Sequence, residues 1–390
     1  MPHLPDARAH LFALPMKTAL LTFFLGLLVG IPSMPAASLP TWAAKNTAGL
    51  PVRIAVAAPE GDRFAHLSWP KAVRTPRGTV LLAYSAGQGH NTGSSGPSVS
   101  RSTDGGKTFS APHLLMRFPE DDARYLDCGN VALGVAENGD ALLLAMAYRR
   151  DEANDIFGWR STDDGVTWTR SDTSALGPNK TGSVFGAIVP VKGQGLVALG
   201  HYRAGAKPYT RGIWLSASPD NGRRWGEARR IADVAAVEPM LVPAGGRLLG
   251  FFRGENALGG RQYVGASDDD GLTWKTSLSV LDSENPKAAR LAAPCAVESP
   301  TKPGEILVLT TERAVPGNTP GRIWLWRGDA GKLAWKRERV LLEFPKIEGD
   351  PNTDLGYPWL LHVSGHRWQM FYYHGNARAS AHIWVTDVEL

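Results

Sequence analysis

The sequence predicts an all-β fold, a six-bladed β-propeller with Asp-box repeats whose ring is closed by an N-terminal strand. Three observations predict it. Glycine (43) and proline (28) are frequent among 390 residues, which favours short strands and turns over a helical bundle. A strand–turn–strand pattern recurs six times at intervals of ~50–65 residues, within the range of propeller blades. A second motif, Ser-x-Asp-x-Gly-x-Thr-Trp, interleaves with the first.

Residues 1–38 are predicted to be a signal peptide. Lys17 precedes an apolar run at residues 18–31, which is too short to span a bilayer comfortably. Small residues and prolines follow it, as in secretory signals. The alternative is a retained anchor helix. We therefore expect a periplasmic or secreted protein with no membrane span after removal of the signal.

Each predicted blade opens with two apolar strands joined by a tight turn. The turns contain glycine where a hairpin needs a positive φ angle. The first is followed by the apolar strand at residues 80–84, and the others are followed by similar strands. The six turns lie at residues 75–78, 137–140, 192–195, 244–247, 302–305 and 364–367.

The Ser-x-Asp motif is expected to form the turn between the third and fourth strands of a blade. Its Ser and Asp oxygens can accept hydrogen bonds from the backbone N–H groups of the same turn. These aspartates are therefore interpreted as structural and not catalytic. Four copies and a degenerate fifth lie at residues 102–109, 161–168, 218–225, 267–274 and 328–335.

Residues 45–390 are predicted to form one propeller without a second domain. The chain ends on a third strand, at residues 383–386, and no sixth Ser-x-Asp motif follows. The missing fourth strand is expected from residues 51–57. Pairing of the first strand with the last would remove two open sheet edges.

Composition and cysteine count exclude several classes of protein. The net charge is +5 without a Lys/Arg block, so we expect no nucleic acid partner. Two cysteines, Cys128 and Cys295, exclude a disulfide scaffold and are predicted to be free thiols. Phosphate-loop, zinc-protease, serine-hydrolase and EF-hand motifs are absent from the sequence. We expect no cofactor, no metal ion and a monomer.

Polar residues are concentrated on one predicted face, formed by the loops between second and third strands and the starts of the first strands. An arginine-rich mouth suits an anionic ligand, because guanidinium forks match carboxylate oxygens. The loops carry Arg149, Arg150, Arg203, Arg211, Arg253, Arg261, Arg313, Arg322 and Arg378. The strand entries carry Trp69, Lys71, Asp127, Asn130, Phe185, Glu238, Cys295 and Tyr357.

The chain resembles the sialidase (neuraminidase) superfamily of BNR/Asp-box repeat proteins over essentially the whole predicted propeller. The segment from Glu238 to Arg253 is similar to the one that carries a catalytic glutamate and a carboxylate-binding arginine. Arg322 matches another such arginine, and Tyr357 lies in a segment like that of the tyrosine nucleophile. The resemblance implies a glycoside hydrolase in which Glu238 is the base that activates Tyr357, acting like an exo-α-sialidase on a terminal, acidic sugar.

Two positions depart from the sialidase pattern. Ser68 stands where the first arginine of the carboxylate clamp belongs. Lys71, beside Trp69 at the same strand entry, can supply charge there but not a bidentate fork. The loop that carries the family's acid/base aspartate, residues 85–97, contains no Asp or Glu. His90 and Asp127 are therefore the candidates for the acid/base group.

We accordingly predict catalytic roles for Tyr357, Glu238, Asp127 and His90, and substrate binding by Arg253, Arg322, Lys71 and Trp69. The expected partner is a glycan or glycoconjugate. One alternative is a non-catalytic propeller that binds glycan or protein, since Asp-boxes also occur in such proteins. A polysaccharide lyase is a third reading.

Overall fold

The computed structural model describes residues 40, 42–90, 95–151, 153–177, 179–180, 182–204, 210–254, 261–278, 281, 290–313, 321–345 and 353–390. All of them lie in one compact unit, Pro40–Leu390. The predicted signal peptide, residues 1–38, lies outside the described residues. Within the described ranges, no helix is long and apolar enough to cross a membrane.

The described chain is built almost entirely of strands, as predicted, with one short 3-10 helix, η1 (Ser174–Leu176). The strands form successive antiparallel sets, which we number ladder 1 to ladder 6 along the chain. Ladder 1 contains β3 (His66–Arg74), β4 (Val80–Gly87), β5 (Gly96–Ser102) and β6 (His113–Leu114); ladder 2 contains β7 (Tyr125–Val135), β8 (Ala141–Arg149), β9 (Ala153–Ser161), β10 (Thr169–Ser171) and β11 (Asn179–Lys180); ladder 3 contains β12 (Ser183–Val184), β13 (Gly186–Val191), β14 (Gly195–Ala204), β15 (Thr210–Ser218) and β16 (Arg229–Ala232).

The second half of the chain repeats this arrangement and adds the two N-terminal strands. Ladder 4 contains β17 (Ala236–Ala244), β18 (Arg247–Gly254), β19 (Gln262–Ser267) and β20 (Lys275–Leu278); ladder 5 contains β21 (Arg290–Leu291), β22 (Cys295–Glu298), β23 (Glu305–Arg313), β24 (Gly321–Asp329), β25 (Ala334–Phe344) and, at its edge, β1 (Lys45–Asn46); ladder 6 contains β26 (Thr353–Ser364), β27 (Arg367–Asn376), β28 (Ala381–Glu389) and β2 (Val52–Val56).

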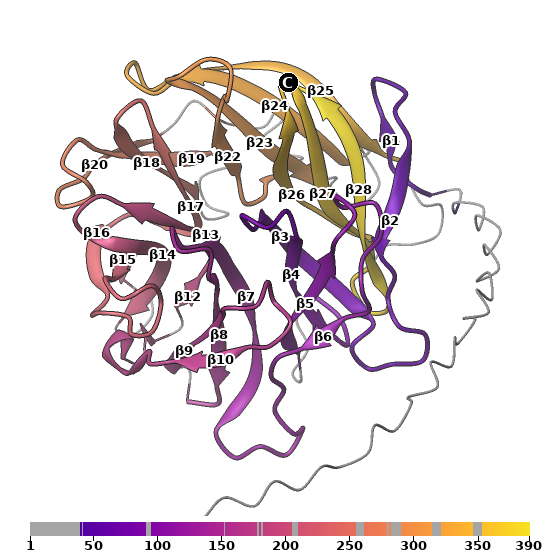
Figure 1. Cartoon of the computed structure of the whole chain (residues 1–390), viewed down its shortest axis with the longest axis horizontal. Coiled ribbons are helices and arrows are strands. Elements are labelled where there is room, and N and C mark those ends of the chain that lie inside the picture. Colours follow the sequence, from indigo (N-terminus) through magenta and orange to yellow (C-terminus); the bar gives the residue numbers. More distant parts are fainter. Residues whose placement is uncertain are drawn as a thin grey trace, which may run out of the picture. The chain divides into compact units, whose positions relative to one another are not determined.

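We call one strand of each ladder its first strand: β3, β7, β13, β17, β22 and β26. These strands lie nearest the middle of the described unit (Figure 1). β3 packs beside β7, β7 beside β13, β13 beside β17, β17 beside β22, β22 beside β26, and β26 beside β3. The segment expected at residues 51–57 contains β2, which pairs antiparallel with β28 through Val52–Thr386 and Arg53–Val385. The pairing of β1 with β25 was not predicted.

Neighbouring ladders pack face to face, and side-chain alternation along each strand fills both interfaces. In β8, Leu143 and Ala145 belong to the apolar cluster shared with ladder 1. Leu142 and Leu144 belong to the cluster shared with ladder 3. Successive side chains of a strand point to opposite faces, so a ladder with neighbours on both sides needs apolar residues throughout. This explains the continuous apolar runs of the second strands, where the leucines of β8 are at most 1% exposed.

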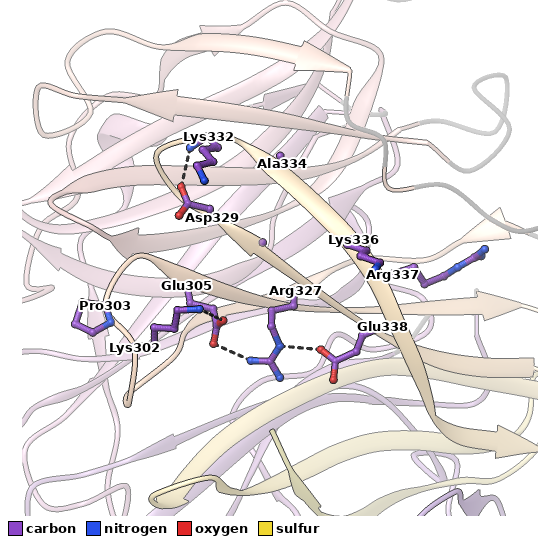
Figure 2. Close-up of a pocket in the computed structure, with 11 residues that line it drawn as sticks. Lys302, Pro303, Glu305, Arg327, Asp329, Lys332, Ala334, Lys336, Arg337 and Glu338 are labelled. Atoms are coloured by element: carbon purple, nitrogen blue, oxygen red, sulfur yellow. Dashed lines mark hydrogen bonds and ion pairs between the residues drawn. The ribbon is translucent and has the colours of Figure 1, made fainter.

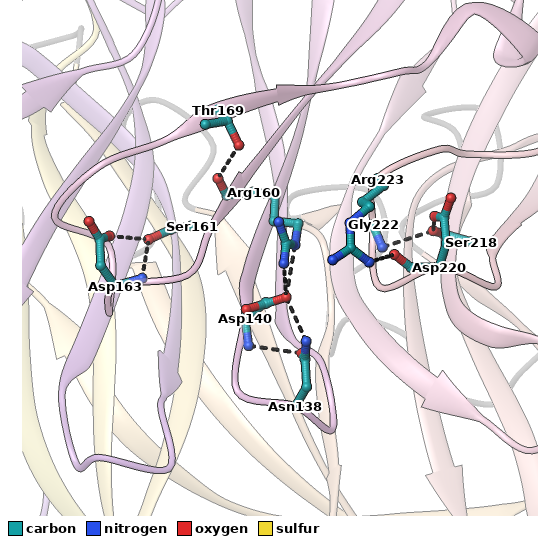
Figure 3. Close-up of polar contacts among 10 residues, drawn as sticks. All are labelled: Asn138, Asp140, Arg160, Ser161, Asp163, Thr169, Ser218, Asp220, Gly222 and Arg223. Atoms are coloured by element: carbon teal, nitrogen blue, oxygen red, sulfur yellow. Dashed lines mark hydrogen bonds and ion pairs between the residues drawn. The ribbon is translucent and has the colours of Figure 1, made fainter. Parts of the chain in front are cut away.

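The Ser-x-Asp turns hydrogen-bond to themselves, as predicted (Figure 3). Ser161 Oγ accepts the N–H of Gly165 at 2.8 Å, and Asp163 Oδ1 accepts the N–H of Thr167 at 2.9 Å. The Thr167 hydroxyl donates to Asp163 Oδ2 at 2.6 Å. These bonds use the carboxylate within its own turn. Equivalent contacts surround Asp104, Asp220 and Asp269.

Arginine side chains join most neighbouring ladders, a feature that the sequence analysis did not identify. Arg53 on β2 donates to the carbonyl oxygen of Lys107 in ladder 1 at 2.9 Å. A guanidinium has five N–H donors, which suits it to carbonyl groups left exposed at a turn. Comparable bonds to the next ladder are made by Arg101 to Asp164, Arg229 to Leu272, Arg247 to Ala330 and Arg339 to Glu389.

Cys128 and Cys295 are free thiols, as predicted, and both are fully buried, whereas partial burial was expected. Cys128 lies in β7 of ladder 2 and Cys295 in β22 of ladder 5.

Replacing an aspartate of a Ser-x-Asp turn should lower stability without touching activity. We expect Asp163→Ala to lower the free energy of unfolding by about 1–2 kcal/mol, because three turn hydrogen bonds, from Ser161 Oγ, the Thr167 N–H and the Thr167 hydroxyl, lose their acceptor. Denaturant unfolding measures this change. Asp121→Ala, which removes an exposed carboxylate outside the turns, is the control. An Asp163→Ala protein as stable as the control would contradict the structural interpretation.

Candidate functional site

Four first strands break their register at equivalent places, and each break holds a residue in the left-handed backbone region. The residues are Trp69 (φ 59°), Asn130 (φ 53°), Glu238 (φ 51°) and Tyr357 (φ 53°). The breaks interrupt the pairing of β3, β7, β17 and β26 with the second strands of their ladders. A bulge of this kind re-aims a side chain relative to the strand. A positive φ is unusual for bulky residues and marks a site to examine for function.

Side chains of the preceding ladder hold three of these breaks in place. Thr311 Oγ1 on β23 accepts the N–H of Tyr357 at 3.1 Å. Ser85 Oγ on β4 accepts the N–H of Asn130 at 3.1 Å. His201 Nδ1 on β14 accepts the N–H of Glu238 at 3.3 Å. Each register break frees a backbone N–H from the pairing of the strands. In all three cases a side chain on the second strand of the preceding ladder accepts that N–H.

His201 can accept this bond only with an unprotonated Nδ1. Burial, together with the charge of Arg203, lowers the pKa of His201 to about 3. The ring is therefore neutral over the physiological pH range, and its Nδ1 lone pair faces the Glu238 backbone.

Tyr357, Glu238 and Arg253 form one hydrogen-bonded cluster. The Tyr357 hydroxyl donates to Glu238 Oε1 at 2.7 Å, and Arg253 Nη1 donates to Glu238 Oε2 at 2.8 Å. Arg253 Nη1 also lies 3.2 Å from Tyr357 Oη. Tyr357 is 4% exposed, so this polar group is largely removed from water. Three groups distant in sequence, from β26, β17 and β18, thus meet at one phenolic oxygen.

Electrostatics fix the protonation states of the cluster. Burial raises the pKa of Glu238, but the charge of Arg253 and the hydrogen bonds from Arg253 and Tyr357 outweigh it, so the net shift is downward. The carboxyl is therefore ionised. Burial and then the negative charge of Glu238 raise the pKa of Tyr357 well above its usual range. The resting pair is a neutral phenol that donates to a carboxylate.

The second arginine at the tyrosine is Arg313. Its guanidinium carbon lies 5.2 Å from the centre of the Tyr357 ring. Arg322, which the sequence analysis assigned to the clamp, is placed differently: Nη1 lies 4.0 Å from Glu312 and Nε 4.0 Å from Glu343. Arg313 is the last residue of β23, and Arg322 lies at the start of β24. Sequence spacing alone therefore does not show which of the two lies beside Tyr357.

Lys71 lies beneath the site, not at its surface. It is 1% exposed, and its Nζ donates to the carbonyl oxygens of Trp69 at 3.1 Å and Pro70 at 3.4 Å. Nζ also lies 3.8 Å from the centre of the Phe185 ring, a cation–π arrangement. Lys71 thereby binds the backbone at the Trp69 register break. A buried amine in this position does not reach a sugar carboxylate, contrary to the expectation for this residue.

Trp69 does lie at the site, next to both candidate catalytic groups. Its ring contacts the Tyr357 ring at 6.2 Å between centres and the His90 ring edge-on at 5.2 Å. His90 Nδ1 is joined to Asp354 Oδ2 by a 2.5 Å hydrogen bond. His90 therefore stands one aromatic ring away from the tyrosine.

Asp127 is placed at the outer end of β7, where its carboxylate accepts the N–H of Ser95 at 3.1 Å. Burial raises the pKa of Asp127 to about 6. The described hydrogen bonds of this side chain are with the backbone of Ser95 and Cys128 and not with Tyr357 or Glu238.

Asp354 and Tyr373 also belong to this region, although the sequence analysis did not single them out. The Tyr373 hydroxyl donates to Asp354 Oδ1 at 2.6 Å and accepts a 2.7 Å bond from Arg313 Nη2. Asp354 stands three residues before Tyr357 in β26, and residues i and i+2 share a strand face, so without the register break the two would not be expected on one side. Among the described residues, no group of three or more His, Cys, Asp or Glu side chains is arranged to hold a metal ion.

A separate groove of about 540 Å³ lies on ladder 5 (Figure 2). It is lined by the start of β23 and the end of β24, whereas Arg313 lies at the other end of β23, about 26 Å away along an extended strand. Its charges pair with one another: Arg327 contacts Glu305 and Glu338, both at 2.7 Å, and Lys302 contacts Glu305 at 3.0 Å. The groove is thus distinct from the Tyr357 cluster.

Solved structures identify the fold as that of sialidases and arabinanases. The NanB sialidase from Streptococcus pneumoniae, in complex with 2-[(3-chlorobenzyl)ammonio]ethanesulfonate, is 14% identical; the match covers 88% of this chain and 71% of that one, with a TM-score of 0.64. The Hadza microbial sialidase Hz136 is 19% identical, covering 84% of this chain and 66% of that one, with a TM-score of 0.63. An α-L-arabinanase from Penicillium chrysogenum, complexed with arabinobiose, is 16% identical, covering 89% and 98%, with a TM-score of 0.58.

The all-β prediction is confirmed by these matches, which at such identities establish the fold alone. The family follows from the sequence itself. The chain belongs to the BNR repeat-like domain family, whose model matches residues 122–372, and the predicted place in the sialidase/BNR superfamily is confirmed. No curated protein matches the chain significantly.

The hydrogen bond from the Tyr357 N–H to Thr311 Oγ1 can be removed without changing the shape of the Thr311 side chain. We expect Thr311→Val to lower the free energy of unfolding by about 1–2 kcal/mol, because the buried Tyr357 N–H loses its acceptor. Denaturant unfolding measures the loss. Thr311→Ser keeps the hydroxyl and should recover most of the stability; equal losses in both variants would show that the methyl contact and not the hydrogen bond matters.

Lys71 should make stability depend on pH in the alkaline range. Burial lowers the pKa of Lys71 from 10.5 to about 7. Between these values the unfolded chain binds a proton that the folded chain has lost, so stability rises as pH increases from about 7 to about 10. At about 1.4 kcal/mol per pKa unit the rise amounts to a few kcal/mol. Denaturant unfolding across this range should show the rise in the wild-type protein and a flatter profile in Lys71→Met; parallel profiles would contradict it.

Proposed function

We propose that this protein is a glycoside hydrolase that removes a terminal, acidic sugar, with Tyr357 as nucleophile and Glu238 as its base. The observation that carries the proposal is the 2.7 Å bond from the Tyr357 hydroxyl to Glu238 Oε1, with Arg253 in contact with both groups. A nucleophile bonded to a base that a third group orients is the arrangement of covalent catalysis.

The cluster supplies what attack by a phenol requires. Tyr357 is uncharged at rest, so it becomes nucleophilic when Glu238 takes its proton as the bond to the anomeric carbon forms. Arg253 and Arg313 lie beside the ring and stabilise the negative charge that develops on the phenolic oxygen. Tyrosine nucleophiles are the sialidase exception to the two-carboxylate scheme of glycosidases.

The two arginines also support an acidic sugar. Among the described residues, Arg253 uses Nη1 for both of its hydrogen bonds, which leaves Nε and Nη2 for a ligand. A guanidinium pairs with a carboxylate in a bidentate manner. A neutral phenol nucleophile also avoids the repulsion that a carboxylate nucleophile would feel beside an anionic sugar.

The finer architecture and location belong to the same proposal. The six ladders are interpreted as blades of a closed propeller in which β2 completes the blade of β28. The predicted signal at residues 1–38 makes the protein periplasmic or secreted. It acts on glycans as a monomer.

A non-catalytic glycan-binding propeller is the second candidate. The observation that favours it is the absence of a third clamp residue: Ser68 occupies the position of the missing arginine, and Lys71 is buried under Trp69. A turnover assay distinguishes the two candidate functions. A non-catalytic binding protein never releases product, and it still binds its ligand when Tyr357 is replaced.

Tyr357→Phe should abolish hydrolysis, lowering kcat by about 10⁴-fold or more, because it removes the attacking oxygen. Glu238→Gln should lower kcat by about 10²–10⁴-fold through the loss of the base. The assay uses the mature chain with a fluorogenic aryl sialoside, with uronides and with neutral aryl glycosides.

Tyr372→Phe is the matched control, because Tyr372 is fully buried and its hydroxyl has no hydrogen-bond partner among the described residues. It should keep full activity. Activity that survives in Tyr357→Phe would refute the nucleophile assignment, and glycan binding without any turnover would favour the second candidate.

A further inference from the structure

A buried carboxylate, Asp354, gathers polar groups on the side of the site away from Glu238. It is 5% exposed. Its Oδ2 lies 2.5 Å from His90 Nδ1 and 3.2 Å from His66 Nε2, and its Oδ1 accepts the Tyr373 hydroxyl at 2.6 Å. Arg313 Nη2 lies 3.6 Å from the same Oδ1. Both oxygens of one buried carboxylate are therefore occupied, and one of them binds an imidazole.

The environment keeps Asp354 ionised. Burial raises the pKa of Asp354, but the bonds from His66 and His90 and the charge of Arg313 outweigh it and hold the pKa well below its usual range. A carboxylate accepts and does not donate, so His90 Nδ1 carries the hydrogen of this bond. This fixes the tautomer and leaves Nε2 as the working nitrogen of His90.

The ring of His90 is linked to that of Tyr357 through one intervening ring, Trp69. It packs edge-on against Trp69, and Trp69 packs against Tyr357. The His90 side chain is 23% exposed, and no described residue hydrogen-bonds its Nε2. The titratable groups in contact with the ring are Asp354 and His66. Arg313 and Tyr373 contact the other oxygen of Asp354, and Arg378 follows Ala377, whose carbonyl oxygen accepts the His90 N–H.

We propose that His90 is the acid/base group of the reaction and that Asp354 is its positioning residue. The proposal rests on the proposed function. In the first step Tyr357 Oη attacks the anomeric carbon and gives its proton to Glu238, while the glycosidic C–O bond breaks and its oxygen takes the proton from His90 Nε2. In the second step water attacks the anomeric carbon and gives a proton to His90, the bond to Tyr357 breaks, and Glu238 returns the proton to the tyrosine.

The histidine replaces a carboxylic acid for a physical reason visible in the cluster. Arg313 and Arg253 flank Tyr357, and the two carboxylates Glu238 and Asp354 offset them. A third carboxylate would have to stay protonated in this field to act as an acid. An imidazole held by Asp354 transfers a proton through Nε2 without adding a negative charge to the site.

Leaving-group chemistry tests the role of His90. An aryl glycoside with an acidic phenol departs without help, whereas an alkyl glycoside of the same sugar needs a proton donor. His90→Gln should lower kcat/KM for the alkyl glycoside by about 10²–10⁴-fold and for the aryl glycoside much less. An equal loss on both substrates would overturn the proposal.

Asp354→Asn tests the positioning role. It should reproduce the leaving-group dependence of His90→Gln and lower kcat with KM little changed; an equal loss on the alkyl and the aryl glycoside would overturn it. If Asp354→Asn fails to fold, nitrogen NMR of the wild-type His90 ring decides, because the proposal requires the hydrogen on Nδ1. The other neutral tautomer there would refute the positioning.

Asp127→Asn is the comparison variant, since Asp127 is the other candidate acid. Leaving-group dependence in His90→Gln alone supports His90; the same dependence in Asp127→Asn alone overturns the assignment. Failure of the proposed nucleophile is separable, because Tyr357→Phe should lose both substrates equally. If Tyr357→Phe keeps turnover and His90→Gln still shows the dependence, the nucleophile is wrong and the acid is right. A wild-type protein that hydrolyses neither glycoside overturns both.

Discussion

The left-handed backbone of Glu238 and Tyr357 is the constraint on which the site depends. The inner strands of a ladder are packed between neighbouring ladders, so an ordinary residue of these strands points into an apolar interface and not toward the middle. Breaking the register at one residue turns its side chain out of that interface. A non-glycine residue in this conformation costs about 1–2 kcal/mol, and both residues precede proline, which disfavours helical-type conformations further. The preceding ladder offsets the cost by satisfying the freed backbone N–H groups.

This arrangement makes the chemistry depend on the packing between ladders. Thr311 belongs to ladder 5 but holds Tyr357 of ladder 6, and His201 belongs to ladder 3 but holds Glu238 of ladder 4. Each of these two residues is thus held by a side chain of the preceding ladder. Placing the reactive groups on rigid strands and supporting them from a second layer is how a site keeps its geometry within a fraction of an ångström.

The fold was largely predictable because its signals are local. Glycine turns, Ser-x-Asp turns and apolar second strands repeat, and each repeat is read without knowledge of the others. The side-chain pairs at the site were not predictable from such local signals. Glu238, Arg253 and Tyr357 were identified through a resemblance, whereas Asp354 gave no signal, since an aspartate three residues before a tyrosine in a strand is expected on the other face. Arg313 gave no signal of its own for the same reason: it ends β23 as Arg322 begins β24, and the sequence does not show which side chain packs beside Tyr357. Lys71 was misplaced because a lysine at a strand entry is ordinarily solvated, and burial over Phe185 cannot be read from its neighbours in sequence.

The charge distribution around Tyr357 explains why the site can work with two arginines. Glu238 with Arg253 and Asp354 with Arg313 form two pairs on either side of one neutral phenol. Burial and the charge of Glu238 raise the pKa of Tyr357, and the two arginines lower it less, so the resting phenol stays protonated and the charge appears only as the proton moves to Glu238. A third arginine would stabilise the phenolate at rest and strengthen the grip on the substrate equally before and during the reaction. Since only interactions that strengthen in the transition state accelerate chemistry, replacing that arginine by Ser68 costs binding more than turnover. The departure from the sialidase pattern at Ser68 is therefore compatible with catalysis, provided that a group such as His90 protonates the leaving oxygen.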